Sequence, residues 1–200
     1  MIFALLHVKA PHLAKQRLSA ALTPAERETL ARSMYEEMMA KLRAARGIDR
    51  IVVATSDPAI AAHARRSGAL VLEETEQHSH SRSANAAARW AMELGAATVI
   101  LLPIDVPLAT TAEIEALAAA ARPGVLIIPS ADGTGTNALV LTPPDAIAGS
   151  FGPGSFRRHL QAAQDRGLAV EVLRPPGLVF DVDTPEDLAE IRRAPCPSAS

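Results

Sequence analysis

The chain has 200 residues, a formal net charge of −2, and 48% hydrophobic but only 3% aromatic residues, so we expect one domain with an aliphatic core and no general nucleic-acid binding. Its one cysteine, Cys196, excludes an internal disulfide framework and a cysteine metal site. Because the start lacks the basic region of a signal peptide and no apolar run approaches the roughly 20 residues of a membrane helix, we expect a cytoplasmic protein without a membrane partner.

Short aliphatic runs alternate with helix signals along the chain. The runs predict strands at residues 2–8, 51–55, 69–72, 98–102, 125–128, 138–141, 170–173 and 178–180. Hydroxyl or Asp caps and helix-ending glycines predict helices at residues 23–47, 57–68, 83–94, 110–121, within 154–166 and from 184. This alternation predicts a three-layer, Rossmann-like α/β fold whose mostly parallel central sheet has helices on both faces. We expect a single domain over residues 1–194 and a disordered tail at 195–200.

Two carboxylates near the C-terminus stand out, Asp181 and Asp183 in Val-Phe-Asp-Val-Asp-Thr-Pro-Glu-Asp. If a strand continues through them, alternation places both side chains on one face, about 6–7 Å apart. A third acid, Asp105, follows the run at 98–102 and is flanked by prolines. Such carboxylates suit a hard divalent cation such as Mg²⁺, although each could instead be a turn former or a helix cap.

The loop after the first predicted strand is basic, with Lys9, Lys15 and Arg17. Loops at the carboxyl ends of parallel strands are where open α/β sheets bind ligands. Three cations there could hold a triphosphate and stabilise charge at its α-phosphorus, or they could be ordinary solvated side chains. The loop has no glycine-rich Walker or Rossmann pattern.

Two glycine-containing segments are further candidates for anion binding. Residues 132–137 lie between two predicted strands, and residues 149–156 lead into a helix. Backbone N–H groups in such loops and at helix N-termini bind phosphates, but both segments could also be ordinary turns. A third polar segment contains His78 and His80, which could bind a metal but are more simply explained as solvated side chains.

Together these motifs resemble the phospholactate guanylyltransferases of the CofC/FbiD type, in order and from about residue 4 to 192. The matching segments are 8–9, 14–18, 23–27, 102–108, 135–139, 151–156 and 180–188. The resemblance implies a nucleotidyltransferase fold and a GTP-dependent enzyme of deazaflavin coenzyme biosynthesis. Members join GMP to phospholactate, phosphoenolpyruvate or 3-phosphoglycerate and release pyrophosphate.

The resemblance also implies roles for single residues. Asp105, Asp181 and Asp183 would be Mg²⁺ ligands, with Asp105 also catalytic. Thr136, Gly152 and Ser155 would contact the phosphorylated acid. Lys9, Lys15 and Arg17 would bind the GTP phosphates and take part in catalysis.

The sequence departs from the family pattern at the predicted third helix. Members usually show Gly-Leu-Asn-x-Ala, whereas this chain has Ser83-Ala84-Asn85-Ala86-Ala87. Ser83 and Asn85 are therefore the candidates for contacts with the nucleotide in this region. A second change, Ala10-Pro11 for the usual Pro-Leu, keeps the spacing between Lys9 and Lys15.

We expect in-line attack of the acid's phosphate on the α-phosphorus of GTP. The phosphate is already anionic, so no general base is needed. Two alternatives remain: a nucleotidyltransferase for a sugar phosphate or molybdopterin, and a non-catalytic nucleotide-binding domain. The Met-rich helix, with Met34, Met38 and Met39, could serve the core or the interface of a homodimer.

Overall fold

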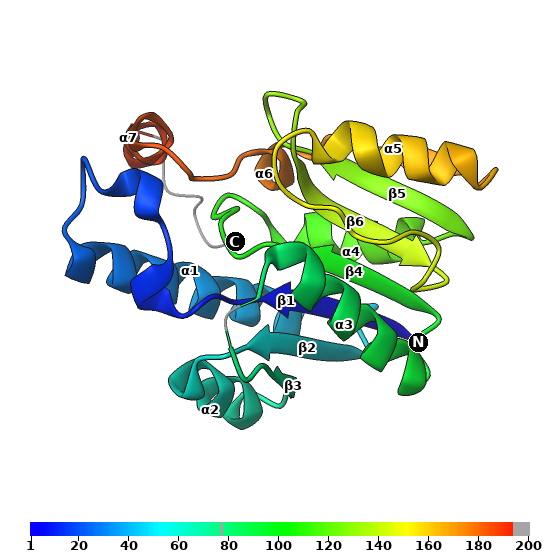
Figure 1. Cartoon of the computed structure of the whole chain (residues 1–200), viewed down its shortest axis with the longest axis horizontal. Coiled ribbons are helices and arrows are strands. Elements are labelled where there is room, and N and C mark those ends of the chain that lie inside the picture. The colour runs from blue at the N-terminus through cyan, green and yellow to red at the C-terminus, as the bar shows by residue number, and fades with distance from the viewer. Residues whose placement is uncertain (77, 194–200) are drawn as a thin grey trace.

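The structure is a computed structural model that describes residues 1–76 and 78–193. Within them, seven strands form one sheet in the order β3-β2-β1-β4-β6-β5-β7 (Figure 1). The strands are β1 (Ile2–His7), β2 (Arg50–Thr55), β3 (Leu70–Glu73), β4 (Thr98–Leu102), β5 (Gly124–Pro129), β6 (Thr136–Thr142) and β7 (Val170–Val172). The predicted tail at 195–200 and the domain limit at 194 lie outside the described residues.

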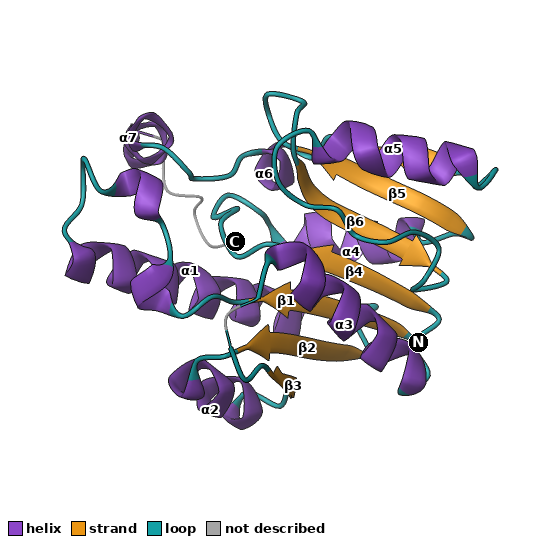
Figure 2. Cartoon of the chain, in the orientation of Figure 1, coloured by secondary structure: helices purple, strands orange, loops and turns teal. Residues whose placement is uncertain are grey.

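Helices cover both faces of this sheet, which confirms the predicted three-layer α/β fold (Figure 2). The α-helices are α1 (Pro24–Ala44), α2 (Pro58–Arg66), α3 (His80–Glu93), α4 (Thr111–Ala120), α5 (Ser155–Asp165), α6 (Pro176–Val179) and α7 (Pro185–Arg193). Two short 3-10 helices, η1 (Pro11–Leu13) and η2 (Gln16–Leu18), lie in the loop between β1 and α1.

The alternation of β1 shows how the aliphatic sequence builds two cores. Ala4 and Leu6 face a core completed by α1, α2, α4 and α6. Phe3 and Leu5 face the opposite core, which α3 and α5 complete. Successive side chains of a strand point to opposite faces, so a run that is apolar throughout is buried on both sides. Figure 1 shows α3 in front of the sheet and α4 behind it.

The reversed direction of β6 decides which residues meet at the functional edge. Strand β1 pairs in parallel with β2 and β4, whereas β6 pairs antiparallel with both β4 and β5. The start of β6 therefore lies beside the carboxyl ends of its neighbours, and Thr136 is opposite Pro129 at the end of β5. The carboxyl ends of the strands are the ligand-binding edge in open α/β sheets.

Two predicted elements are corrected. Residues 178–180 are not a strand, because Pro176 and Gly177 open the short helix α6 and Asn137 donates to the carbonyl oxygens of Leu178 and Val179. Asp181 and Asp183 therefore follow a helical turn, and strand alternation does not align them. Helix α3 begins at His80 rather than Ser83, because the Ser79 side chain caps it by accepting from the backbone N–H of Arg82.

The methionines of α1 belong to the core. Met38 and Met39 are each 1% exposed and pack against the sheet, while Met34 packs in a smaller cluster with Leu18 and Leu188. This burial explains their presence without an interface between subunits. No helix in the described part of the chain combines the length and apolar character needed to cross a membrane.

Candidate functional site

Two adjoining cavities open at the carboxyl edge of the sheet. The first has a volume of about 480 Å³ and is lined by the loop before β6, the N-terminus of α5 and the segment before α7. The second, about 460 Å³, is lined by the β1–α1 loop and the start of α3. Both volumes are typical of small-molecule sites. The walls share Arg17, His80, Pro103, Asp105, Phe151, Gly152 and Asp183.

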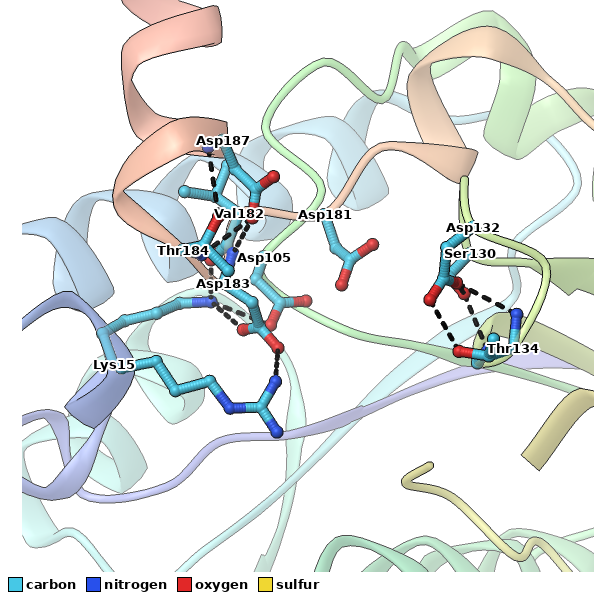
Figure 3. A network of polar contacts seen from close by, with 12 residues as sticks. Lys15, Asp105, Ser130, Asp132, Thr134, Asp181, Val182, Asp183, Thr184 and Asp187 are labelled. Carbon is cyan, nitrogen blue, oxygen red and sulfur yellow. Dashed lines mark hydrogen bonds and ion pairs between the residues drawn. The ribbon is translucent and has the colours of Figure 1, made fainter. Parts of the chain in front are cut away.

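A buried ammonium group joins the acids at this boundary. The Lys15 Nζ donates to Asp105 Oδ2 at 2.9 Å, to the carbonyl oxygen of Val182 at 2.7 Å and to Asp183 Oδ1 at 3.3 Å. Figure 3 shows the Lys15 side chain reaching toward these residues. The more exposed Arg17 contacts the other oxygen of Asp183 at 3.2 Å. Residues that are far apart in the sequence thus form one charged network.

The backbone and the charge of Lys15 are both unusual. Its φ of 53° is the one positive value at a non-glycine position in the described residues. A left-handed Lys is uncommon and indicates that surrounding contacts hold the conformation. Burial by itself lowers the pKa of the ammonium, but Asp105 and Asp183 outweigh burial and the pKa is raised above its ordinary value. Lys15 is therefore a permanently charged partner for the two acids.

Asp181 lies in the same charged region but makes different contacts. Its Oδ1 accepts a hydrogen bond from Asn137 Nδ2 at 3.2 Å, and in Figure 3 it lies apart from the Lys15 group. Burial raises the pKa of the Asp181 carboxyl, and the nearby negative charges of Asp105 and Asp183 add to this effect. Asn137, which has no predicted role, thus donates both to Asp181 and to the carbonyl oxygens of Leu178 and Val179 in α6.

The three predicted metal ligands all line the first cavity, but they are not gathered into a preformed cluster. Across residues 1–76 and 78–193, no three His, Cys, Asp or Glu side chains are arranged as a metal site. Asp105 and Asp183 meet through Lys15, whereas Asp181 is held by Asn137. His78 and His80 likewise form no such cluster, and His80 belongs to the first turn of α3.

The start of α7 is fixed as the sequence predicts. The Thr184 hydroxyl accepts from the backbone N–H of Asp187 at 3.3 Å. In return, Asp187 Oδ2 accepts from the backbone N–H groups of Asp183 and Thr184. Burial tends to raise the pKa of Asp187, but these hydrogen bonds lower it overall. This reciprocal cap holds Asp183 at the mouth of the first cavity.

The loop before β6 is organised around Asp132. This carboxylate accepts from the hydroxyl of Ser130 and from both the backbone N–H and the hydroxyl of Thr134 (Figure 3). These hydrogen bonds, led by that of Ser130, lower the pKa of Asp132 to about 2. The loop delivers Thr136 to the wall of the first cavity. Its internal hydrogen bonds satisfy Asp132 without any ligand.

The glycine-rich segment before α5 forms another part of the wall of the first cavity. Gly152 has a φ of 104°, which a residue with a Cβ adopts only with strain. Ser155, the first residue of α5, is 1% exposed, and its hydroxyl has no hydrogen-bond partner in the described residues. A buried, unpartnered hydroxyl beside the N–H groups of a helix N-terminus suits an anionic oxygen. Arg158 holds the segment by donating to Ser150 and Pro153.

A row of rings was not anticipated from the sequence, and two of its members, His80 and Phe151, line both cavities. His7 stacks on His80, His80 stacks on Phe151 at 4.2 Å between centroids, and Phe151 meets His159 edge-on. Burial lowers the pKa of His7 to about 3 and those of His80 and His159 to about 4. The rings are therefore neutral near pH 7. Because the row joins residues as far apart along the chain as His7 and His159, local sequence patterns do not reveal it.

The predicted nucleotide-binding residues divide into two groups. Lys9, Lys15 and Arg17 all line the second cavity. Ser83 and Asn85 are absent from the described linings of both cavities. Ser83 is fully buried in α3, and Asn85 exchanges two hydrogen bonds with the backbone of Gly149, at 2.7 and 2.9 Å.

The chain is similar over almost its full length to guanylyltransferases. The family model described as Guanylyl transferase CofC like matches residues 2–193. The phosphoenolpyruvate guanylyltransferase of Sphaerobacter thermophilus is 40% identical, with 94% of this chain and 91% of that protein covered. The 2-phospho-L-lactate guanylyltransferase of Methanothermobacter thermautotrophicus is 38% identical, with 89% and 78% covered. The 3-phospho-D-glycerate guanylyltransferase of Colwellia psychrerythraea is 34% identical, with 90% and 86% covered.

Solved structures show the same fold. A Desulfovibrio desulfuricans G20 protein, assigned as a nucleotide-diphospho-sugar transferase, superposes with a TM-score of 0.81 at 17% identity, covering 99% of this chain and 89% of that one. A nucleotidyl transferase from Methanothermobacter superposes with a TM-score of 0.66 at 17% identity, covering 96% of both chains. At such identities the likeness concerns the fold alone. The family model and the full-length relatives go further: this chain belongs to the CofC-like guanylyl transferase family.

Proposed function

We propose that this protein transfers the guanylyl group of GTP to a small phosphorylated three-carbon acid and releases pyrophosphate. The observation that carries the proposal is the pair of adjoining cavities that share Asp105, Asp183 and Arg17. One cavity has the basic residues suited to a triphosphate, and the other has hydroxyls and a helix N-terminus suited to a phosphorylated acid. The candidate acids are 2-phospho-L-lactate, phosphoenolpyruvate and 3-phospho-D-glycerate, the substrates for which relatives are named.

The reaction needs positioning and charge stabilisation more than proton transfer. An oxygen of the acid's phosphate attacks the α-phosphorus of GTP, a new P–O bond forms, and the bond to the β-phosphate oxygen breaks. Pyrophosphate leaves with the electron pair of that bond. Lys9, Lys15 and Arg17 would stabilise the negative charge, while Thr136, Gly152 and Ser155 would orient the acid. The neutral His80 and His159 are not required as bases.

Mg²⁺ fits the chemistry of the acidic residues. Asp105, Asp181 and Asp183 offer only oxygen ligands, which Mg²⁺ prefers. The pKa of Asp181, raised by burial and by its two acidic neighbours, indicates negative charge that Lys15 and Arg17 compensate only in part. These three carboxylates would hold the ion, which would neutralise charge on the reacting phosphates when bound. We also propose that the product serves deazaflavin coenzyme biosynthesis.

The test is pyrophosphate release on incubation with GTP, Mg²⁺ and each acid in turn. We expect release with at least one acid, and strong loss in Asp105→Asn. The matched control is Asp145→Asn, an exposed Asp outside both cavities, which keeps activity. A folded protein that is silent with all three acids contradicts the proposal. Release with sugar phosphates instead would favour a sugar-phosphate nucleotidyltransferase, and GTP binding without release would favour a binding domain.

A further inference from the structure

His159 lies between the two halves of the proposed acid site. It belongs to α5, is fully buried, and uses both ring nitrogens. Nε2 lies 2.7 Å from the backbone nitrogen of Ser150, and Nδ1 lies 3.0 Å from the hydroxyl oxygen of Thr136. The ring thus links the glycine-rich segment to the start of β6.

These contacts determine which nitrogen carries the proton. A backbone N–H can only donate, so Nε2 must accept from Ser150 and carries no hydrogen. Burial and the neighbouring Arg158 and His80 lower the pKa of His159 to about 4, so the ring is neutral near pH 7. A neutral ring without a proton on Nε2 carries it on Nδ1. Nδ1 therefore donates to the Thr136 hydroxyl.

The direction of this bond determines what Thr136 can offer to a ligand. Because its oxygen accepts from His159, its own O–H must point elsewhere, and Thr136 lines the first cavity. No second partner for this hydroxyl is found among the described residues. We infer that His159 is a positioning residue that sets the Thr136 hydroxyl as a hydrogen-bond donor to an anionic oxygen of the acid substrate. The inference rests on the proposed function, which places the acid in this cavity.

Other hydrogen bonds also hold the glycine-rich segment that His159 contacts. The effect of a His159 substitution on binding can therefore be measured while the segment keeps its conformation. Arg158 donates to the carbonyl oxygens of Ser150 and Pro153. Ser81 accepts from the backbone N–H of Phe151, and Asn85 holds Gly149. We therefore expect the segment to stay in place when only the His159 ring is altered.

Two substitutions separate the two hydrogen bonds of the ring. In His159→Asn, the side-chain amide nitrogen lies near the position of Nδ1 and can still donate to Thr136. In His159→Gln, the amide oxygen can reach the position of Nε2 and accept from Ser150, while the donor to Thr136 is lost. Thr136→Val removes the hydroxyl at nearly constant shape. Each variant is assayed for the KM of acid and GTP, for acid binding by calorimetry, and for thermal unfolding.

The inference predicts that His159→Gln weakens acid binding about 10- to 100-fold, as expected for a lost hydrogen bond to a charged group. The KM for GTP stays unchanged, and His159→Asn keeps most of the affinity. Thr136→Val matches His159→Gln, and the double variant is no weaker than Thr136→Val alone, because both remove the same interaction.

Other results would overturn the inference. If His159→Asn and His159→Gln weaken acid binding equally, the ring only fills space. If acid binding is unchanged in His159→Gln, the hydrogen bond that His159 donates to Thr136 is not needed. Proton-detected NMR of the His159 nitrogens in the unmodified protein gives a check that needs no variant: a proton on Nε2 contradicts the inference. Acid binding with this variant pattern but without pyrophosphate release would overturn the proposed function alone, whereas a protein that neither binds nor converts any acid overturns both.

Discussion

The Lys15 ammonium lies 2.9 Å from Asp105 and 3.3 Å from Asp183, and it donates to both while also donating to the carbonyl oxygen of Val182. One cation therefore connects the β1–α1 loop, the loop after β4 and the segment before α7. The network brings together a cation and two carboxylates that the proposed reaction needs. It also makes the stability of this edge depend on charge balance.

Lys15→Met tests that dependence. Without the ammonium, Asp105 and Asp183 lose their buried counter-ion, and we expect the free energy of unfolding to fall by roughly 3 kcal/mol in Mg²⁺-free buffer. Pyrophosphate release should fall at least about 100-fold. Arg17→Met is the matched control, because Arg17 contacts the same Asp183 from the surface and should contribute less than about 1 kcal/mol. Urea unfolding measures the free energy of unfolding of both variants. An equal loss of that free energy in Lys15→Met and Arg17→Met would contradict the prediction.

Asp181→Asn should have opposite effects on stability without Mg²⁺ and on the response of that stability to Mg²⁺. The pKa of Asp181 is raised, so its ionised form destabilises the folded state above that pKa, and the penalty disappears as the pH falls and the group is protonated. Removing the charge should therefore raise the melting temperature at pH 7 without Mg²⁺, while Asn137 can still donate to the new amide oxygen.

If Asp181 binds the proposed Mg²⁺, the same variant should also lose the thermal stabilisation that we expect Mg²⁺ to give the unmodified protein. Differential scanning fluorimetry with and without Mg²⁺ provides the measurement, and samples that contain EDTA define the metal-free baseline. A variant that is less stable without metal, or that keeps the full Mg²⁺ response, would argue against Asp181 as a ligand.

Asn85→Ala distinguishes a loop anchor from a contact with the base. Asn85 satisfies both the N–H and the carbonyl oxygen of Gly149, so we expect a loss of about 1–3 kcal/mol in unfolding free energy. The preference for GTP over ATP should not change, because Asn85 does not line either cavity. The ratio of kcat/KM for the two nucleotides is the readout. A large drop in that ratio would instead support the nucleotide contact expected from the sequence.

The buried histidines predict acid sensitivity. His7 has an ordinary pKa of 6.5 that falls to about 3 in the folded protein, chiefly through burial. The unfolded state therefore binds an extra proton between these values, and stability falls as the pH drops through this window. His7→Phe should reduce the slope of unfolding free energy against pH by about 1.4 kcal/mol per unit near pH 5.

Urea unfolding at several pH values between 7 and 4 measures that slope. The control is His12→Asn, which replaces an exposed histidine of the β1–α1 loop. An unchanged slope in His7→Phe would mean that the His7 ring is protonated in the folded state.

Local sequence was enough for most of the fold. Aliphatic runs such as 98–102 form buried strands because alternation of side chains leaves both faces apolar. The caps at Thr23 and Thr110 start helices as their hydrogen-bonding patterns predict. The prediction failed at 178–180. There Asn137, distant in the sequence, donates to the carbonyl oxygens of Leu178 and Val179 and so stabilises a helical turn.

The sequence by itself determined the kinds of groups this protein has for its site: acids after two apolar runs, cations after the first strand, and glycines before a helix. Only the tertiary structure decided how they meet. The reversed β6 brings Thr136 to the ligand-binding edge, and a buried Lys15 joins two of the three acids while Asn137 holds the third. His159 reaches Thr136 from a different element, so the proton on its ring depends on a contact between segments. Residue type sets chemical capacity, but proximity, burial and hydrogen-bond direction arise from packing across the chain.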